Sequence, residues 1–88
     1  MYKKNKNCKE AILEGATLIH NGEDNSLHLL NETATVIWNN VEICNINEIV
    51  YKIKETYSDV SFEEVVNDVN ETIIVMIDKG LLTKNCNN

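Results

Sequence analysis

The sequence has no proline, no arginine and only three glycines among its 88 residues. Because proline and glycine most often interrupt helices and strands, we expect regular elements separated by a few turns. Hydrophobic residues make up 43% of the chain, which is enough for one core and is not the composition of a disordered protein. The length allows a single domain, which buries about two-thirds of the surface that its unfolded chain exposes.

Positive charge is also scarce. The chain has eight lysines and 14 aspartate and glutamate residues, so its formal net charge is −6. Nucleic acids and anionic membranes are bound by clustered lysine and arginine side chains, which release the counterions around the phosphates. The charge balance therefore argues against both kinds of partner and favours a neutral or basic one.

Cysteine is limited to Cys8, Cys44 and Cys86, an odd number without the close pairing of zinc sites and disulfide frameworks. We interpret them as free thiols in a reducing compartment, with their role open, and expect neither a metal site nor a cofactor. The longest apolar run covers only residues 73–77, far short of the ~20 residues of a membrane helix. The N-terminus lacks the apolar stretch of a signal peptide, so we expect a cytoplasmic protein without a membrane partner.

Two β-prone runs, residues 16–20 and 26–30, flank the polar segment 21–25. Its Asn-Gly dipeptide supplies the positive φ angles of a tight reversal, so the segment predicts a β-hairpin with a five-residue loop. A preceding strand near residues 11–14 would make the sheet three-stranded.

Helices are predicted after the hairpin. Asn31 stands where the first helix needs an N-cap, and this helix ends near Asn39-Asn40. A second helix begins near Asn45 or Asn47 and runs to Tyr57, with apolar residues recurring at three- and four-residue steps.

Charged and capping residues mark the later helices. Glu48 and Lys52 form a correctly ordered i,i+4 pair on the second helix. Ser61 and Glu64 predict a capping box at the start of the third helix, and Gly80 predicts its end.

The third helix carries two apolar sets. One continuous stripe contains Val65, Val69, Ile73 and Met76. A second set lies beside it and is interrupted by a single asparagine: Val66, Asn70, Ile74 and Ile77. Since one stripe suffices to close a small core, the second predicts either an apolar surface for a partner or a deeply buried helix.

Strands followed by helices predict an α+β fold of the winged helix-turn-helix type, a three-stranded antiparallel sheet followed by three helices. The domain is expected to cover residues 11–84. The polar segments 1–10 and 85–88 are predicted as flexible tails.

The sequence contains few features that indicate a catalytic site. His20 and His28 belong to the two strands of the hairpin, where they could lie near one another, but a lone histidine in a strand is typical of a half-buried structural residue. Phosphate-binding loops, dinucleotide fingerprints and metalloprotease or hydrolase motifs are absent from the sequence. We therefore expect no catalytic residues and no enzyme activity.

Two other functions remain open alternatives. A winged helix suggests DNA binding, but the third helix offers Lys79 as its only basic residue and is otherwise acidic on its exposed face. The broad apolar surface of this helix, or an exposed strand edge, would instead serve self-association into a homodimer.

Peptide recognition fits the pattern best. A strand at the edge of a sheet exposes unpaired amides and carbonyls, so an extended peptide can add as a further strand. The candidate is the strand 26–30, in which Leu27 and Leu29 point to one face and His28 and Leu30 to the other. Alternate side chains of the peptide would enter a groove against the third helix.

The same residues carry a family resemblance over residues 12–83. The hairpin, Leu30-Asn31-x-Thr33-Ala34-x-x-Ile37-Trp38, Glu48-Ile49-Val50, Asp68-Val69 and Lys79-Gly80-Leu81-Leu82 follow in an order that resembles the PqqD family of RiPP recognition elements. Members of this family bind the leader segment of ribosomally made precursor peptides and present it to a modifying enzyme.

The resemblance implies a winged-helix-like fold with the leader peptide antiparallel to the third strand and packed against the third helix. Carried over to this chain, the implied peptide-binding residues are Leu27, His28, Leu29, Val66, Asn70, Ile73, Ile74 and Ile77. A small separate chain resembles the family members that serve a separate partner such as a radical SAM maturase or a leader peptidase. The precursor peptide, the partner enzyme and the modification are not implied.

Overall fold

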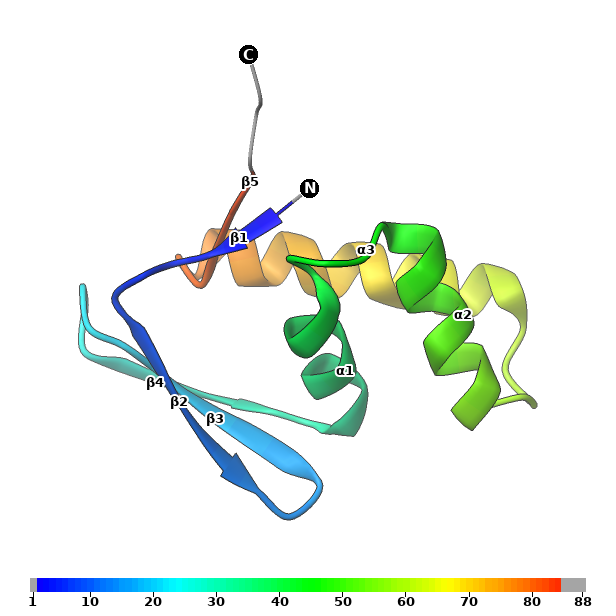
Figure 1. Cartoon of the computed structure of the whole chain (residues 1–88), viewed down its shortest axis with the longest axis horizontal. Coiled ribbons are helices and arrows are strands. Elements are labelled where there is room, and N and C mark those ends of the chain that lie inside the picture. The colour runs from blue at the N-terminus through cyan, green and yellow to red at the C-terminus, as the bar shows by residue number, and fades with distance from the viewer. Residues whose placement is uncertain (1, 85–88) are drawn as a thin grey trace.

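The computed structural model describes residues 2–84, which form five strands and three helices (Figure 1). The predicted tail 85–88, and Cys86 within it, lie outside the described residues. In chain order the elements are β1 (Tyr2–Lys4), β2 (Cys8–Leu13), β3 (Ala16–Asn21), β4 (Ser26–Leu30), α1 (Glu32–Asn40), α2 (Ile46–Thr56), α3 (Phe62–Asp78) and β5 (Leu82–Lys84).

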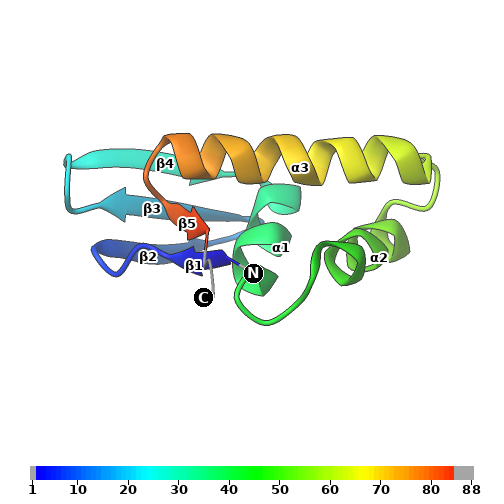
Figure 2. The ribbon, with the colours of Figure 1, turned by 90° about the horizontal axis from the view of Figure 1, so that it is seen from above.

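The strands form two antiparallel sheets. β2, β3 and β4 pair in that order, and β1 pairs with β5. α3 runs alongside β4 in the opposite direction, so that its last turns lie next to the second half of this strand (Figure 2). The predicted α+β architecture, a three-stranded antiparallel sheet followed by three helices, is confirmed.

One face of the three-stranded sheet points towards the helices. Thr17, Ile19 and Asn21 of β3 are buried, whereas the residues between them are half-buried. The register sets Ile19 opposite His28 and Thr17 opposite Leu30. Directly opposite residues of an antiparallel pair point to the same face, so His28 and Leu30 face the helical layer.

The core lies between this face and the helices and is closed by Trp38 of α1, which is 1% exposed. The indole N–H of Trp38 donates to Glu10 Oε2 at 2.6 Å, which satisfies the buried donor. Lys4 Nζ lies 4.7 Å from the centroid of the same ring. These contacts attach β1 and β2 to α1.

The predicted stripe of α3 is confirmed as core, since its members are all buried: Val65, Val69, Ile73 and Met76.

The predicted hairpin is confirmed in its strands and wrong in its turn. Asn21 and Ser26 pair directly, so the loop has four residues. The positive φ lies at Asn25 (61°), and Gly22 is outside the positive region. Gly22 is instead required for space, because a Cβ there would meet Asn7 O at 2.9 Å.

The N-terminal segment differs from the tail expected for residues 1–10. Tyr2–Lys4 pairs with Leu82–Lys84, and β2 already begins at Cys8. Asn5 and Asn7 donate side-chain hydrogen bonds to the carboxylate of Glu23 in the hairpin loop. These bonds hold the pKa of Glu23 below its usual range.

The helix caps lie at the predicted residues, but the capping box is on α2 and not on α3 as predicted. The Asn31 side chain accepts from the Ala34 N–H at 2.9 Å, as expected for an N-cap. The complete capping box is at Asn45 and Glu48, whereas at Ser61 only the hydroxyl accepts, from the Glu64 N–H. Because the Glu48 carboxylate caps its own helix, the predicted pair with Lys52 is not formed.

The C-terminus of α3 ends in a Schellman motif. Gly80 has a φ of +74°, its N–H donates to Ile77 O at 3.0 Å, and the Leu81 N–H donates to Met76 O at 2.9 Å. The motif turns the chain sharply, so that Leu81 is buried under the end of α3 and β5 can pair with β1.

Alanine at the two glycines with positive φ should have unequal costs. Gly15→Ala places a Cβ in open space and costs only the left-handed backbone strain of about 1 kcal/mol. Gly80→Ala carries the same strain and also forces away the Asn21 side-chain amide, which lies 3.2 Å from the new Cβ. We expect the larger loss in free energy of unfolding for Gly80→Ala in urea denaturation, and equal losses would contradict the motif.

The attachment of Asn5 and Asn7 to the hairpin should depend on pH. Because the pKa of Glu23 is lowered in the folded state, the stabilisation is present above the ordinary glutamate pKa and is lost as the pH falls through the lowered value. NMR of the asparagine side-chain amides should show a transition there. Glu23→Gln should abolish it; a transition that persists in this variant would assign it to another group.

Candidate functional site

The β4 strand lies at the edge of the three-stranded sheet, and its hydrogen-bond phase follows from the register. The Gly22 N–H donates to Asn7 O at 2.9 Å, which makes the adjacent opposite pair, Cys8 and Asn21, a non-hydrogen-bonded pair. Asn21 therefore directs its backbone groups to β4, where it stands opposite Ser26. The pairing of β3 with β4 thus uses every second residue from Ser26 onward.

The alternate residues of β4 face away from β3. Ser26, His28 and Leu30 direct their N–H and C=O groups to β3, and Leu27 and Leu29 direct theirs to the free edge of the sheet. The side chains of Leu27 and Leu29 point to the outer face and are 64% and 66% exposed. The strand thus offers two donors and two acceptors at its edge.

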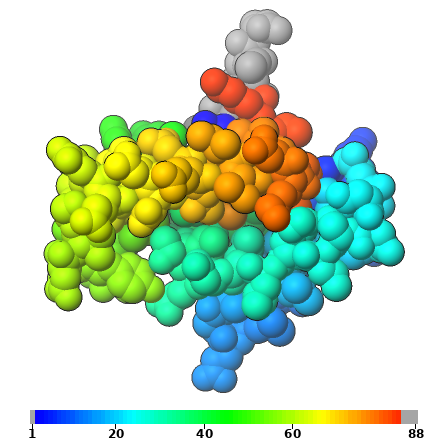
Figure 3. Space-filling model, turned by 180° about the vertical axis from the view of Figure 1, so that it is seen from behind, coloured from blue at the N-terminus to red at the C-terminus, as the bar shows by residue number. Residues whose placement is uncertain are grey.

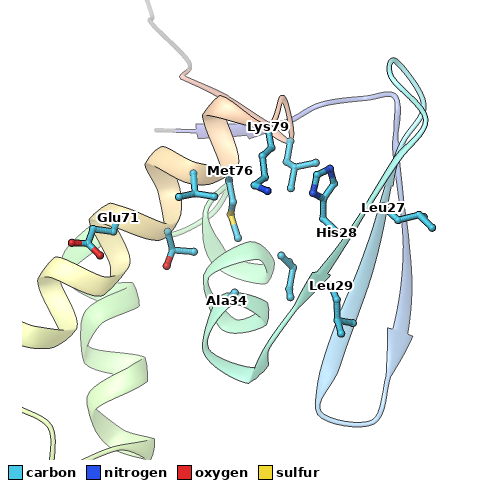
Figure 4. Close-up of a pocket in the computed structure, with 11 residues that line it drawn as sticks. Leu27, His28, Leu29, Ala34, Glu71, Met76 and Lys79 are labelled. Carbon is cyan, nitrogen blue, oxygen red and sulfur yellow. The ribbon is translucent and has the colours of Figure 1, made fainter.

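A groove of about 460 Å³ lies between this edge and α3. Figure 3 shows the side of the molecule on which the last turns of α3 lie above β4 and the start of α1. The groove contains buried apolar side chains at its base and half-buried or exposed ones at its rim (Figure 4). Its lining residues are Leu27, His28, Leu29, Leu30, Ala34, Glu71, Thr72, Val75, Met76, Lys79 and Leu81.

Two caps hold the walls of the groove in place. The N-cap Asn31 starts α1 directly after β4, which brings Ala34 beside Leu30. The Schellman turn at Gly80 brings Leu81 back under Met76, and the Asn21 side chain donates to Lys79 O at 3.3 Å. The end of α3 is therefore fixed relative to the sheet.

The groove has a charged residue at each end of its helical wall. Glu71 and Lys79 are exposed, and neither forms an ion pair, since the pair between Lys4 and Glu10 is the only one among residues 2–84. His28 stands on the β4 wall, 2.7 Å from the Ser26 hydroxyl through Nε2.

The His28 ring is oriented by a short polar chain. The Ser26 hydroxyl donates to Asp24, so its oxygen accepts from the His28 Nε2–H. The hydroxyl and N–H of Ser26 together hold the pKa of Asp24 below its usual range. His20, in contrast, is bonded to Asn25 and stands opposite Leu27 on the other face of the sheet. The prediction that the two histidines could lie near one another is therefore wrong.

The structure brings together only part of the predicted peptide-binding set. Leu27, His28 and Leu29 line the groove, whereas the five residues predicted on α3 do not. Ile73 is buried in the core at 2% exposure, Val66 and Ile77 pack half-buried against the core, and Asn70 and Ile74 are exposed elsewhere on the helix.

Helical geometry explains this difference. At 100° per residue, the exposed and half-buried predicted positions lie about 160° around the helix from the wall formed by Glu71, Thr72, Val75 and Lys79. Both of these sides of α3 adjoin the buried stripe. The prediction rested on hydrophobicity and therefore chose the more apolar side. The wall that lines the groove is mixed in polarity, so hydrophobicity did not predict it. The feature that could have predicted it is its position beside Met76 and the Schellman turn, which directs Lys79 and Leu81 towards β4.

Residues 2–84 contain neither a candidate metal site nor a membrane-spanning helix. Within residues 2–84, histidine, cysteine and acidic side chains form no group of three or more that could hold a metal ion. Cys8 and Cys44 are free, and burial together with Glu23 and Asp24 raises the pKa of the Cys8 thiol. None of the described helices is long and apolar enough to span a membrane.

Comparison with models of protein families shows the family of this chain. The model of the family described as coenzyme PQQ synthesis protein D (PqqD) matches residues 17–82. The chain belongs to the PqqD family. The PqqD match includes β4, α1 and α3, and hence the whole groove, and leaves out β1 and β2. No curated protein matches the sequence.

Two solved structures share the fold. One is described as TbiB1 in complex with the TbiA(beta) leader peptide; it is 21% identical, covers 97% of this chain and 99% of its own, and superposes with a TM-score of 0.85. The other is a lasso peptide synthetase B1 complexed with the leader peptide, at 12% identity, 94% and 98% coverage and a TM-score of 0.82. The arrangement of β1 to β5 therefore recurs beyond the range of the PqqD match.

Amide hydrogen exchange should report the backbone phase of β4. In the free protein we expect the amides of Leu27 and Leu29 to exchange rapidly, because they point to the free edge, and those of His28 and Leu30 to exchange slowly. Exchange measured by NMR on the full chain distinguishes adjacent residues. Slow exchange at Leu27 and Leu29, with fast exchange between them, would invert the assigned phase.

Proposed function

We propose that this chain binds the leader segment of a ribosomally synthesised precursor peptide, which adds as a strand to β4. The observation that carries the proposal is the pair of outward-directed backbone units, Leu27 and Leu29, beside the groove of α3. Strand addition needs backbone partners at the edge and space for every second side chain. The leader-peptide complexes of two proteins with this fold support the assignment.

The bound peptide is proposed to run antiparallel to β4. An antiparallel partner continues the pairing already present between β3 and β4. Side chains opposite His28 and Leu30 then point into the groove, while those opposite Leu27 and Leu29 point to the outer face of the sheet.

We further propose that the chain is an accessory protein without its own catalysis, which presents the bound leader in the cytoplasm to a separate enzyme. A radical SAM maturase and a leader peptidase are the candidate classes. The outer sheet face supports this role, because Leu27 and Leu29 leave apolar surface uncovered there when the groove is filled.

DNA binding is disfavoured by the charge of α3. Its exposed residues include Glu63, Glu64, Asp68 and Glu71, which would repel a phosphate backbone. Self-association through the β4 edge remains the competing function. Sedimentation at several concentrations, with and without peptide, separates this alternative, because a dimer built on β4 must dissociate when a peptide occupies the edge.

Proline at Leu29 should abolish peptide binding without unfolding the sheet. It removes an N–H that points away from β3, which edge strands tolerate, and its ring blocks the approach of another strand. With the leader of a precursor peptide encoded beside this gene as ligand, we expect the Kd to rise at least tenfold. Isothermal titration calorimetry measures the affinity, and circular dichroism checks the fold.

Two variants control for the substitution. Ile12→Pro makes the same change at the opposite edge of the sheet, where the Ile12 N–H also points away from β3, and should leave affinity unchanged. Leu29→Ala retains the edge donor and should bind nearly as well as the parent chain. A folded Leu29→Pro variant with unchanged affinity would contradict strand addition to β4.

A further inference from the structure

The groove is electrostatically polarised along its length. Glu71 and Lys79 stand at opposite ends of its helical wall, eight residues or about 12 Å apart along α3. Both side chains are exposed and unpaired within residues 2–84. Between them the wall contains Thr72 and the two apolar residues Val75 and Met76.

The direction of the bound strand fixes which of its ends meets each charge. α3 runs opposite to β4 (Figure 2), so Lys79 lies beside His28, and Glu71 lies farther along α3, past Ala34 of α1 (Figure 4). A peptide antiparallel to β4 passes the start of α1 first, then Leu30, and Ser26 last. The segment that precedes the residue opposite Leu30 therefore meets Glu71, and the residue opposite His28 meets Lys79.

The spacing of the charges matches the repeat of a strand. Groove-facing side chains recur every second residue, and two such steps span about 13 Å. A residue at position i beside Glu71 thus places residue i+2 over Val75 and Met76, and residue i+4 beside Lys79. Asp24 in the hairpin loop, Glu32 in the first turn of α1 and Asp78 also carry carboxylates in this region, but they are not among the residues that line the groove.

We propose that the groove selects leader segments with the pattern basic–x–apolar–x–acidic, read from the N-terminus to the C-terminus. The basic side chain pairs with Glu71, the apolar one packs on Val75 and Met76, and the acidic one pairs with Lys79. This inference rests on the proposed strand addition and specifies the class of peptide bound. The polarity selects the direction as well as the composition of the ligand.

Three synthetic decapeptides test the pattern on the full chain. They share one threonine-rich sequence with a central leucine and carry Lys–x–Leu–x–Glu, Glu–x–Leu–x–Lys or Ser–x–Leu–x–Ser at the groove-facing positions. The first two have equal composition and net charge, so the overall charge of −6 acts on both alike. NMR titration gives each Kd, and shifts of the Leu27 and Leu29 amides locate the peptide.

We expect the Lys–x–Leu–x–Glu peptide to bind about three- to tenfold more tightly than its reversed isomer, with the serine peptide between them. The double variant Glu71→Lys/Lys79→Glu, which retains the net charge, should reverse the order. Equal affinities of the three peptides, with shifts at β4, would overturn the charge pattern and leave strand addition intact. Absence of shifts at β4 with all three would overturn both.

Discussion

The β4 backbone divides its hydrogen-bonding groups between two directions, and the proposed function of the molecule depends on this division. Ser26, His28 and Leu30 hold the strand in the sheet, and Leu27 and Leu29 leave their groups free at the edge. The same alternation sends His28 and Leu30 towards the helices and the two leucines outward. A shift of the register by one residue would exchange both sets at once, removing the groove wall and exposing the core side of the strand.

The remaining elements keep this edge open and place a wall beside it. Trp38 closes the core beneath the sheet, and its bond to Glu10 fixes β2 on the far side. The Schellman turn at Gly80 ends α3 level with β4 and continues into β5, which pairs with the N-terminal strand. The two-stranded sheet therefore fastens the end of α3, so the groove is built before any ligand arrives and little of the binding free energy is spent on ordering it.

Much of this arrangement could be predicted from the sequence, because neighbouring residues determine where these helices and strands begin and end. The N-cap Asn31, the stop at Gly80, the hairpin strands and the buried stripe of α3 each depend on residues a few positions apart. The β1–β5 pairing could not be predicted, since each strand has three residues and its partner lies about 80 positions away. The groove wall of α3 was missed for a related reason. Its position depends on where β4 packs, and its mixture of charged, polar and apolar residues has no periodic signature.

The central claim, that a leader peptide joins the sheet at β4, is tested most directly by amide hydrogen exchange in the bound state. Exchange is measured by NMR on the full chain saturated with the leader encoded beside its gene. The account predicts that the Leu27 and Leu29 amides become protected, while the Ile12 amide at the opposite edge exchanges as in the free protein. Saturable binding that leaves Leu27 and Leu29 unprotected would place the peptide elsewhere and contradict the account.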